Sequence, residues 1–325
     1  MSRKKQQPKT NKIDLLAILG GAEKHLKLKE SPLVQLDPDR LSESMPHIST
    51  GSLNVDYLIG GKENSHGVKP CPGIPRAKLT NIYGQPGAGK TTLALQTVAS
   101  ACAEGGVCVY IDYENEVEPR YAQELGVPVS DPSRFMLLQP DTLEHGFELM
   151  KRFAIAGVDV IIVDSVGAGV PAKNLEKEYG ETNQVGLLAK RWSDFLPEFK
   201  GYVVDGGRTA VIGISQLRDN INTGGSRFAK SYTVQGGNAW KFYSSLQIML
   251  KVIGKDKGLE WDGLQQKMVE AERGNLVRAK LDKCKVSSSK GHEASFIVAN
   301  GIGIDNERSV LDLAILTNIV VKKGS

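Results

Sequence analysis

The sequence predicts an α/β fold, built on a mostly parallel twisted sheet that helices cover on both faces. From residue 79 onward, short continuous apolar stretches alternate with stretches of helical periodicity. The first apolar stretch leads directly into the glycine-rich sequence GQPGAGKT (84–91), which opens a helix. Apolar strands without polar alternation are buried on both faces, and their alternation with helices is typical of a parallel sheet.

The expected elements follow one another in a regular order. Strands are expected at LTNIY (79–83), VCVYID (107–112), FMLLQ (135–139), VDVIIVD (158–164) and TAVIGIS (209–215). The helices between them are expected at 90–104, 119–125, 142–156 and 184–200. After residue 240 the pattern becomes strand-rich, with LQIMLKV (246–252), VRAKLDK (277–283), ASFIVAN (294–300) and a final helix at 309–316.

A separate N-terminal part precedes this core, which we expect to span residues 46–325. Residues 1–12 are polar and basic, and we expect them to form a disordered arm. Apolar residues at helical spacing then predict a helix at 13–28, and a connector interrupted by Pro and Asp extends to residue 45. Because this helix is amphipathic, its apolar stripe must be buried on its own domain or on a neighbouring subunit.

Composition limits the possible partners. The 325 residues carry a formal net charge of only +4, so nucleic-acid binding would come from local loops rather than from a global basic field. The four cysteines (71, 102, 108 and 284) lack zinc-binding spacing, and no stretch is apolar and long enough for a membrane span. We therefore expect free thiols in a reducing cytoplasm, and no membrane partner.

The sequence GQPGAGKT matches the phosphate-binding pattern G-x-x-x-x-G-K-[ST] between a strand and a helix. Its backbone amides would surround the phosphates of ATP, Lys90 would neutralise the β and γ oxygens, and the Thr91 hydroxyl would face Mg²⁺. Asp164 ends an apolar strand at the edge where α/β folds bind ligands, which makes it the expected acidic partner of that ion. The expected nucleotide-binding residues are Gly84, Gln85, Pro86, Gly87, Ala88, Gly89, Lys90, Thr91 and Thr92.

Hydrolysis also needs a carboxylate that orients the attacking water. Ser165 follows Asp164, so the general base must come from elsewhere in the chain. The acidic stretch after the neighbouring strand offers Asp112, Glu114 and Glu116, and the pattern alone does not choose between them.

Two loops are candidates for DNA binding. Gln216 ends a strand beside the phosphate site, where its amide could sense the γ-phosphate and transmit that state to the long loop 217–235. Basic and apolar residues are interleaved in this loop, as suits contacts with phosphates and bases: Arg218, Ile221, Arg227, Phe228 and Lys230. The loop 171–186 has mixed charge, and a plain connector is an equally good interpretation of it.

The basic stretch VRAKLDKCKVSSSK (277–290) raises a separate question. Strand parity places Lys283 and Lys285 on the face that Val277, Ala279 and Leu281 begin. Lysines that continue a buried face should meet an acidic partner.

Six stretches resemble the sequence blocks of the RecA family, in the order of that family. They are HISTGSLNVD, IYGQPGAGKTTLALQ, VYIDYENEVEP, VIIVDSVGA, ISQLR and GGNAWKFYSS, and the resemblance covers roughly residues 47–320. It implies a RecA-like ATPase core that forms a helical homo-oligomeric filament on single-stranded DNA, with ATP at the subunit interfaces. It further implies homologous pairing and strand exchange with double-stranded DNA, in recombination and repair.

The resemblance also implies roles for individual residues. Glu114 would be the general base, Gln216 the sensor, and Lys283 and Lys285 would reach the ATP of a neighbouring subunit. The helix 13–28 would pack on that neighbour, and the loops 171–186 and 217–235 would bind DNA. Further residues that match family positions are Glu118 and Tyr121 beside the adenine, Phe242 at the interface, and Lys190, Arg218, Gly236 and Gly237 at the DNA.

The chain departs from the family pattern in four ways. Segment 60–77 is longer than usual, both DNA loops are slightly long, Asn115 stands where bacterial members often have His, and we expect the small C-terminal domain to be absent. Two other functions are alternatives for such a core. A ring-shaped, helicase-like motor usually has a separate N-terminal assembly domain, and an ATP-gated DNA-binding paralogue would lack the base or the sensor, whereas Glu114 and Gln216 are both present.

Overall fold

The computed structural model describes residues 14–27, 42–175, 186–219, 232–234, 238–262, 264 and 266–321. The chain divides into two units, residues 1–41 and 42–325. In the first unit, α1 (Leu15–Leu26) forms within the predicted range, and Asp14 caps it by accepting a hydrogen bond from the Ala17 amide. Helix α1 buries none of its residues. The predicted arm at 1–12 and the linker up to residue 41 lie outside the described residues.

The second unit contains the remaining elements. Its strands are β1 (His47–Ile48), β2 (Ile74–Pro75), β3 (Lys78–Gly84), β4 (Cys108–Asp112), β5 (Phe135–Leu138), β6 (Val160–Asp164), β7 (Ala210–Asp219), β8 (Tyr232–Val234), β9 (Leu246–Asp262), β10 (Lys267–Cys284), β11 (Glu293–Ala299) and β12 (Gly303–Ile304). Its helices are α2 (Leu53–Gly60), α3 (Lys90–Ala103), α4 (Pro119–Glu124), α5 (Leu143–Ala156), α6 (Ala172–Leu175), α7 (Leu187–Gly206), α8 (Asn238–Tyr243) and α9 (Asn306–Leu316). Among the helices that the structure describes, none could cross a membrane.

A ten-stranded mixed sheet organises this unit, in the order β12-β11-β10-β9-β3-β7-β6-β4-β5, with β8 on β7. The strands from β9 to β5 pair in parallel, and the pairs made by β8, β10, β11 and β12 are antiparallel. The α/β fold class predicted from the sequence is therefore confirmed.

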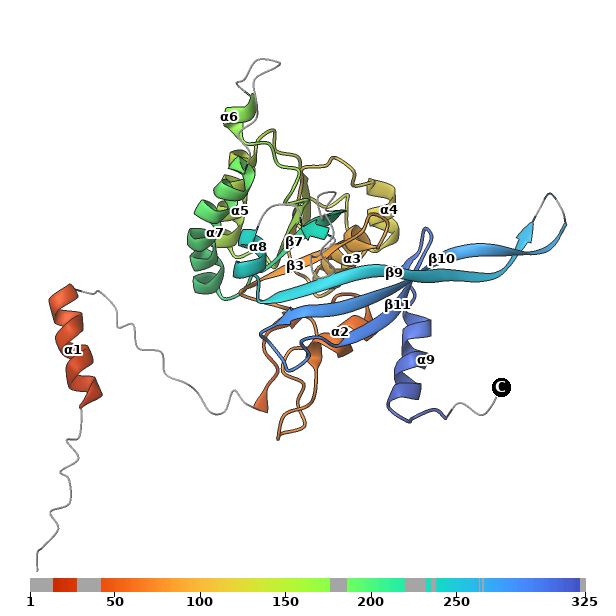
Figure 1. The fold of residues 1–325 in the computed structure, drawn as a ribbon, viewed down its shortest axis with the longest axis horizontal. Helices are drawn as coiled ribbons and strands as arrows, with labels where there is room; N and C mark the ends of the chain where they lie inside the picture. Colours follow the sequence, from red (N-terminus) through yellow and green to blue (C-terminus); the bar gives the residue numbers. More distant parts are fainter. Residues whose placement is uncertain are drawn as a thin grey trace, which may run out of the picture. The chain divides into compact units, whose positions relative to one another are not determined.

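Helices cover both faces of the parallel part (Figure 1). Helix α3 packs over the face that presents Cys108 and Tyr110 of β4, whereas α5, α7 and α8 cover the opposite face, which presents Val109 and Ile111. Edge-to-face contact between Trp192 of α7 and Trp240 of α8, with ring centroids 5.3 Å apart, joins the helices of the second layer. The apolar strands thus have cover on both sides, as their composition requires.

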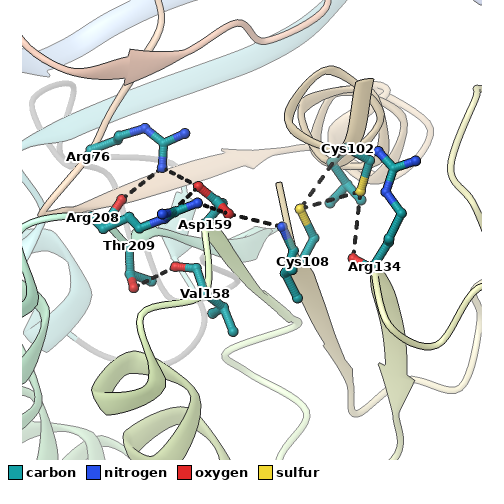
Figure 2. Close-up of polar contacts among 10 residues, drawn as sticks. Arg76, Cys102, Cys108, Arg134, Val158, Asp159, Arg208 and Thr209 are labelled. Carbon is teal, nitrogen blue, oxygen red and sulfur yellow. Dashed lines mark hydrogen bonds and ion pairs between the residues drawn. The ribbon is translucent and has the colours of Figure 1, made fainter. Parts of the chain in front are cut away.

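Asp159 holds together the segments that lead into four parallel strands (Figure 2). Its carboxylate accepts hydrogen bonds from Arg76 before β3, from Arg208 before β7 and from the Val107 amide before β4, all at 2.8–2.9 Å. Burial alone would raise the pKa of Asp159, but these hydrogen bonds outweigh it and lower the pKa below its usual value. The carboxylate is therefore a charged clamp at the edge of the sheet where β3, β4, β6 and β7 begin.

The β9–β10 hairpin is much longer than the sequence predicts. The two strands pair as far as Asp262 and Lys267, and the ribbon projects well beyond the rest of the sheet (Figure 1). Charged residues occupy many positions of its outer part, so the apolar pattern that is typical of a strand is hidden. The charges pair across the ribbon: Lys255 with Glu272 at 3.2 Å, Lys257 with Glu270 at 3.9 Å, and Arg273 with Asp256 at 3.3 Å.

Segment 60–77, which is longer than the family pattern, is ordered by contacts with its own domain. Its C-terminal part forms β2, which pairs with β1 through Ile48 and Ile74. Lys69 lies 3.9 Å from the centre of the Tyr57 ring and donates a hydrogen bond to the Gly61 carbonyl at 2.8 Å.

We predict that Asp159→Asn lowers the free energy of unfolding by about 2–3 kcal/mol, because an amide cannot satisfy both guanidinium groups. Urea denaturation would measure this. Since the pKa of Asp159 is lower in the folded state, the difference between wild type and variant should be full above about pH 4 and shrink as the pH falls further. Glu148→Gln is the control: it breaks an exposed ion pair with Arg152 and should cost less than about 0.5 kcal/mol. Equal losses in the two variants would contradict the clamp.

Candidate nucleotide-binding and hydrolysis site

The polar residues singled out from the sequence meet at one edge of the sheet. Parallel pairing sets Gly84 of β3 opposite Gln216 of β7, and Asp112 of β4 opposite Asp164 of β6. Strand β6 also pairs with β7, so the ends of all four strands lie side by side. This edge is where α/β sheets bind ligands.

The phosphate loop connects β3 to α3. Gly87 and Gly89 have φ angles of 72° and 78°, in the left-handed region that favours glycine. Helix α3 begins at Lys90 without a side-chain cap and without an acidic residue in its first turn, so its first amides are available to an anion. Gln85, Pro86 and Gly87 are exposed, which leaves the loop open to a ligand.

Lys90 and Thr91 face the end of β6. The Lys90 ammonium donates a hydrogen bond to the Gln85 carbonyl at 3.0 Å, and Thr91 Oγ1 donates to Asp164 Oδ2 at 2.9 Å. Burial lowers the pKa of Lys90 from its usual value, although the carboxylates of Asp164 and Glu114 oppose this shift. Phosphate oxygens would stabilise this partly desolvated ammonium.

Asp164 is a buried carboxylate whose ionised form a nearby cation would stabilise. Burial, together with the charges of Glu114 and Asp112, raises its pKa to about 6, although hydrogen bonds from Tyr110 and Thr91 act in the opposite direction. The Thr91 hydroxyl and the Asp164 carboxylate supply oxygen ligands, which Mg²⁺ prefers. Within the described ranges there is no cluster of three His, Cys, Asp or Glu side chains that could hold a metal by itself. The Thr91 hydroxyl and the Asp164 carboxylate could therefore hold Mg²⁺ together with nucleotide phosphates.

Asp112 organises the acidic loop and is not free to act as a base. It is buried, and its carboxylate accepts hydrogen bonds from the amides of Glu114, Asn115 and Val117 at 2.9–3.2 Å. Glu116 is exposed. Of the three carboxylates that the sequence left open, Glu114 is the one that points toward the other strand ends.

Glu114 and Gln216 are in direct contact. Gln216 Nε2 lies 2.9 Å from Glu114 Oε1 and 3.0 Å from Oε2, so one amide group approaches both carboxylate oxygens. Immediately beyond Gln216, β7 leaves the sheet and pairs with β8, from Leu217↔Val234 to Asp219↔Tyr232. The loop predicted to bind DNA thus has its stem directly next to this contact.

The two residues expected beside the adenine lie in and next to α4. Glu118 caps that helix, and its carboxylate accepts hydrogen bonds from the amides of Arg120 at 2.9 Å and Tyr121 at 2.5 Å. The Tyr121 hydroxyl lies 3.0 Å from Thr92 Oγ1 on α3. Tyr121 therefore links α4 to the helix that follows the phosphate loop.

The face expected for Lys283 is wrong. A β-bulge between Leu281 and Lys283 places Leu281 opposite Ile248, but Lys283 opposite Gln247. Gln247 and Ile248 are adjacent in β9 and therefore point to opposite faces of the sheet. Their partners Lys283 and Leu281 do the same, so Lys283 faces away from Leu281. Its ammonium instead donates hydrogen bonds to the carbonyls of Lys241 and Phe242, at 2.8 and 2.9 Å, on α8.

Both lysines lie at the opposite end of β3 from the chain's own phosphate loop. The Lys285 amide donates a hydrogen bond to the Ser245 carbonyl. The Ser245 amide in turn donates to the carbonyl of Leu79, at the start of β3. Strand β3 must advance about 15 Å before it reaches Gly84. Burial, and then the nearby charges of Lys285, Lys200 and Lys241, lower the pKa of Lys283. Phe242, beside this group of four lysines, is 72% exposed.

The structure describes only part of the predicted DNA-binding set. Lys190 is exposed in the first turn of α7, and the backbone of Arg218 pairs with Thr233 in the β7–β8 stem. The other candidates lie outside the described residues: Ile221, Arg227, Phe228, Lys230, Gly236 and Gly237.

One residue of the site was not expected. Tyr110, which strand composition alone would assign to the core, donates a hydrogen bond from its hydroxyl to Asp164 Oδ2 at 2.6 Å. Its position two residues before Asp112 places it on the same face of β4, and this parity was the available signal.

Comparison with known proteins bears on these observations. The family model described as "RecA N-terminal domain" matches residues 20–305. The chain is 36% identical to "Protein RecA" of Laribacter hongkongensis (strain HLHK9), over 90% of this chain and 75% of that relative, and 36% identical to "Protein RecA" of Acidiphilium cryptum (strain JF-5), over 87% and 75%. The crystal structure of the RadB recombinase matches with a TM-score of 0.52 at 21% identity, covering 79% of this chain and 98% of that one, which supports the fold.

We predict that Asp112→Ala slows the expected ATP hydrolysis by about 10- to 100-fold, because the Glu114 loop loses the acceptor for three of its amides. Nucleotide affinity should change little, since Asp112 does not touch the phosphate loop. Turnover assays and equilibrium binding would separate the two effects. Glu116→Gln is the control and should keep the wild-type rate; a loss there, with normal turnover in Asp112→Ala, would identify Glu116 as the base.

Proposed function

The chain belongs to the RecA family and is a RecA-type recombinase, and from this premise we propose that it hydrolyses ATP with Mg²⁺ while assembled as a helical filament on single-stranded DNA. In that assembly it would pair the bound strand with homologous double-stranded DNA and exchange strands. The contact between Glu114 and Gln216, at the junction of the phosphate site and the β7–β8 stem, is the observation that carries this proposal.

The Glu114–Gln216 contact suggests how ATP and DNA communicate. While the Gln216 amide approaches both oxygens of Glu114, the carboxylate is not free to polarise water. A γ-phosphate beside Lys90 would offer the amide a competing acceptor. Gln216 would then release Glu114, which could act as the general base. The same movement of Gln216 would shift the stem of the 217–235 loop, which starts at the next residue. Because coupling is reciprocal, DNA that orders this loop would favour ATP binding.

Two groups of charges favour a position of the ATP site between two subunits. The phosphate site gathers Asp112, Glu114 and Asp164 at one end of the sheet. Lys283 lies near Lys285, Lys200 and Lys241 at the other end, where burial, and then these like charges, lower its pKa. If subunits associate head to tail, this basic surface would meet the phosphates bound to the next subunit. Cations placed on a transferring phosphoryl group typically accelerate the reaction by about 10³-fold or more.

The DNA-binding part of the proposal rests on the position of the β7–β8 stem and on basic residues in the stem and in α7. Lys190 lies in the first turn of α7, and Arg218 lies within the stem. Such cations would contact the phosphate backbone and make DNA binding salt-dependent.

We predict that Glu114→Gln abolishes ATP turnover but keeps ATP and DNA binding, because the phosphate loop remains intact and only the base is lost. With single-stranded DNA and ATP, electron microscopy should show continuous helical filaments of this variant. Wild type should form them with a slowly hydrolysed ATP analogue. Discrete rings, or wild-type ATPase activity that DNA does not stimulate, would overturn the proposal in favour of a ring motor or a paralogue without strand exchange.

The position of the two lysines can be tested by mixing variants. The double variant Lys283→Ala, Lys285→Ala should lose DNA-stimulated turnover, and so should Glu114→Gln. In a 1:1 mixture, about one quarter of head-to-tail interfaces would combine an intact Glu114 with intact lysines from the neighbour. Turnover should therefore recover to about that fraction of wild type. No recovery, while each variant still joins filaments, would show that the lysines do not act across the interface.

A further inference from the structure

Tyr110 is fully buried beneath α3, yet its hydroxyl reaches the site. It belongs to the same core cluster as Leu93 and Ala94 of α3 and Ile162 of β6. It pairs with Ile162 in the parallel ladder, two residues before the pair of Asp112 and Asp164. Its ring therefore runs along the sheet toward the carboxyl edge, and its hydroxyl donates to Asp164 Oδ2 at 2.6 Å.

Two donors meet on this one carboxylate oxygen. Thr91 Oγ1, at the start of α3, also donates to Asp164 Oδ2, at 2.9 Å. The donors come from β4 and from α3. Together they fix the rotation of the carboxyl group, and they leave Oδ1 without either of these two donors.

The Tyr110 hydroxyl lies in the interior of the protein. The residue has no exposed surface. A buried hydroxyl needs a hydrogen-bond partner, and Asp164 is the acceptor within reach.

We propose that Tyr110 is a positioning residue for the divalent cation that accompanies ATP. By holding Asp164 Oδ2 in place, its hydroxyl directs the Thr91 proton toward Asp164, so that the lone pairs of Thr91 Oγ1 point to the cation. The inference rests on the proposed function, in which Thr91 and Asp164 hold Mg²⁺. Groups that orient metal ligands in this way typically change metal affinity by about 10- to 100-fold.

The simpler role, in which Asp164 only satisfies a buried hydroxyl, makes a different prediction. In that case removal of the hydroxyl would change stability but not the requirement for Mg²⁺. Tyr110→Phe tests this difference, since it keeps the ring and its packing. Tyr113→Phe is the matched control: it removes a half-buried tyrosine hydroxyl three residues away, which donates to the Leu143 carbonyl at 3.2 Å and does not contact Asp164.

The experiment titrates MgCl₂ into the full-length protein with a fixed amount of a fluorescent, non-hydrolysed ATP analogue, and urea denaturation measures stability. Tyr110→Phe should need about tenfold more Mg²⁺ for half-saturation, with unchanged nucleotide binding in EDTA. Tyr113→Phe should match wild type. In the Asp164→Asn background, Tyr110→Phe should add less than about a twofold effect, because the two residues act through one contact.

Two results would overturn the inference, and they are distinguishable. If wild type needs Mg²⁺ but Tyr110→Phe has the same half-saturation and loses only stability, the hydroxyl is structural and the proposed function stands. If nucleotide binding to wild type is independent of Mg²⁺, the proposed cation site fails, and the role of Tyr110 fails with it.

Discussion

The parallel register of β3, β7, β6 and β4 is the constraint on which the site depends. Gly84 lies opposite Gln216, and Asp112 lies opposite Asp164, so four strand ends meet in line. A shift of one residue in any pair would turn the side chains to the other face of the sheet. The Asp159 clamp fixes the segments that lead into these strands, at the far edge. Ion pairing at one edge thereby supports the alignment of the site at the other.

The same topology places opposite charges at the two ends of the parallel strands. The phosphate site concentrates carboxylates at the carboxyl edge of the parallel strands. Strand β10, which is antiparallel to β9, ends near the start of β3 and leaves its lysines there. Neither group can neutralise the other within one subunit. A head-to-tail contact, in which the two ends meet around bound phosphates, would satisfy both, and it would link assembly to the nucleotide state.

Local features of the site could be predicted from the sequence, and those that depend on register could not. The phosphate loop and the elements around it are encoded in contiguous residues, so they were expected at nearly their observed positions. The bulge that turns Lys283 to the α8 side depends on pairing with Gln247, 36 positions earlier in the sequence. The length of the β9–β10 ribbon depends on ion pairs between strands, and only the register reveals them.

The number of donors on each carboxylate near the strand ends separates structural from functional roles. Asp159 receives four hydrogen bonds, and Asp112 receives three from backbone amides, so both carboxylates are occupied by fixed groups of the protein. Asp164 instead receives its two side-chain donors on a single oxygen, and Glu114 contacts one side-chain amide. Carboxylates that keep acceptor capacity, or whose single side-chain partner can be drawn away, are the ones able to bind a cation or activate water. Sequence alone presents all four as acidic residues in or near strand ends, and only their surroundings distinguish them.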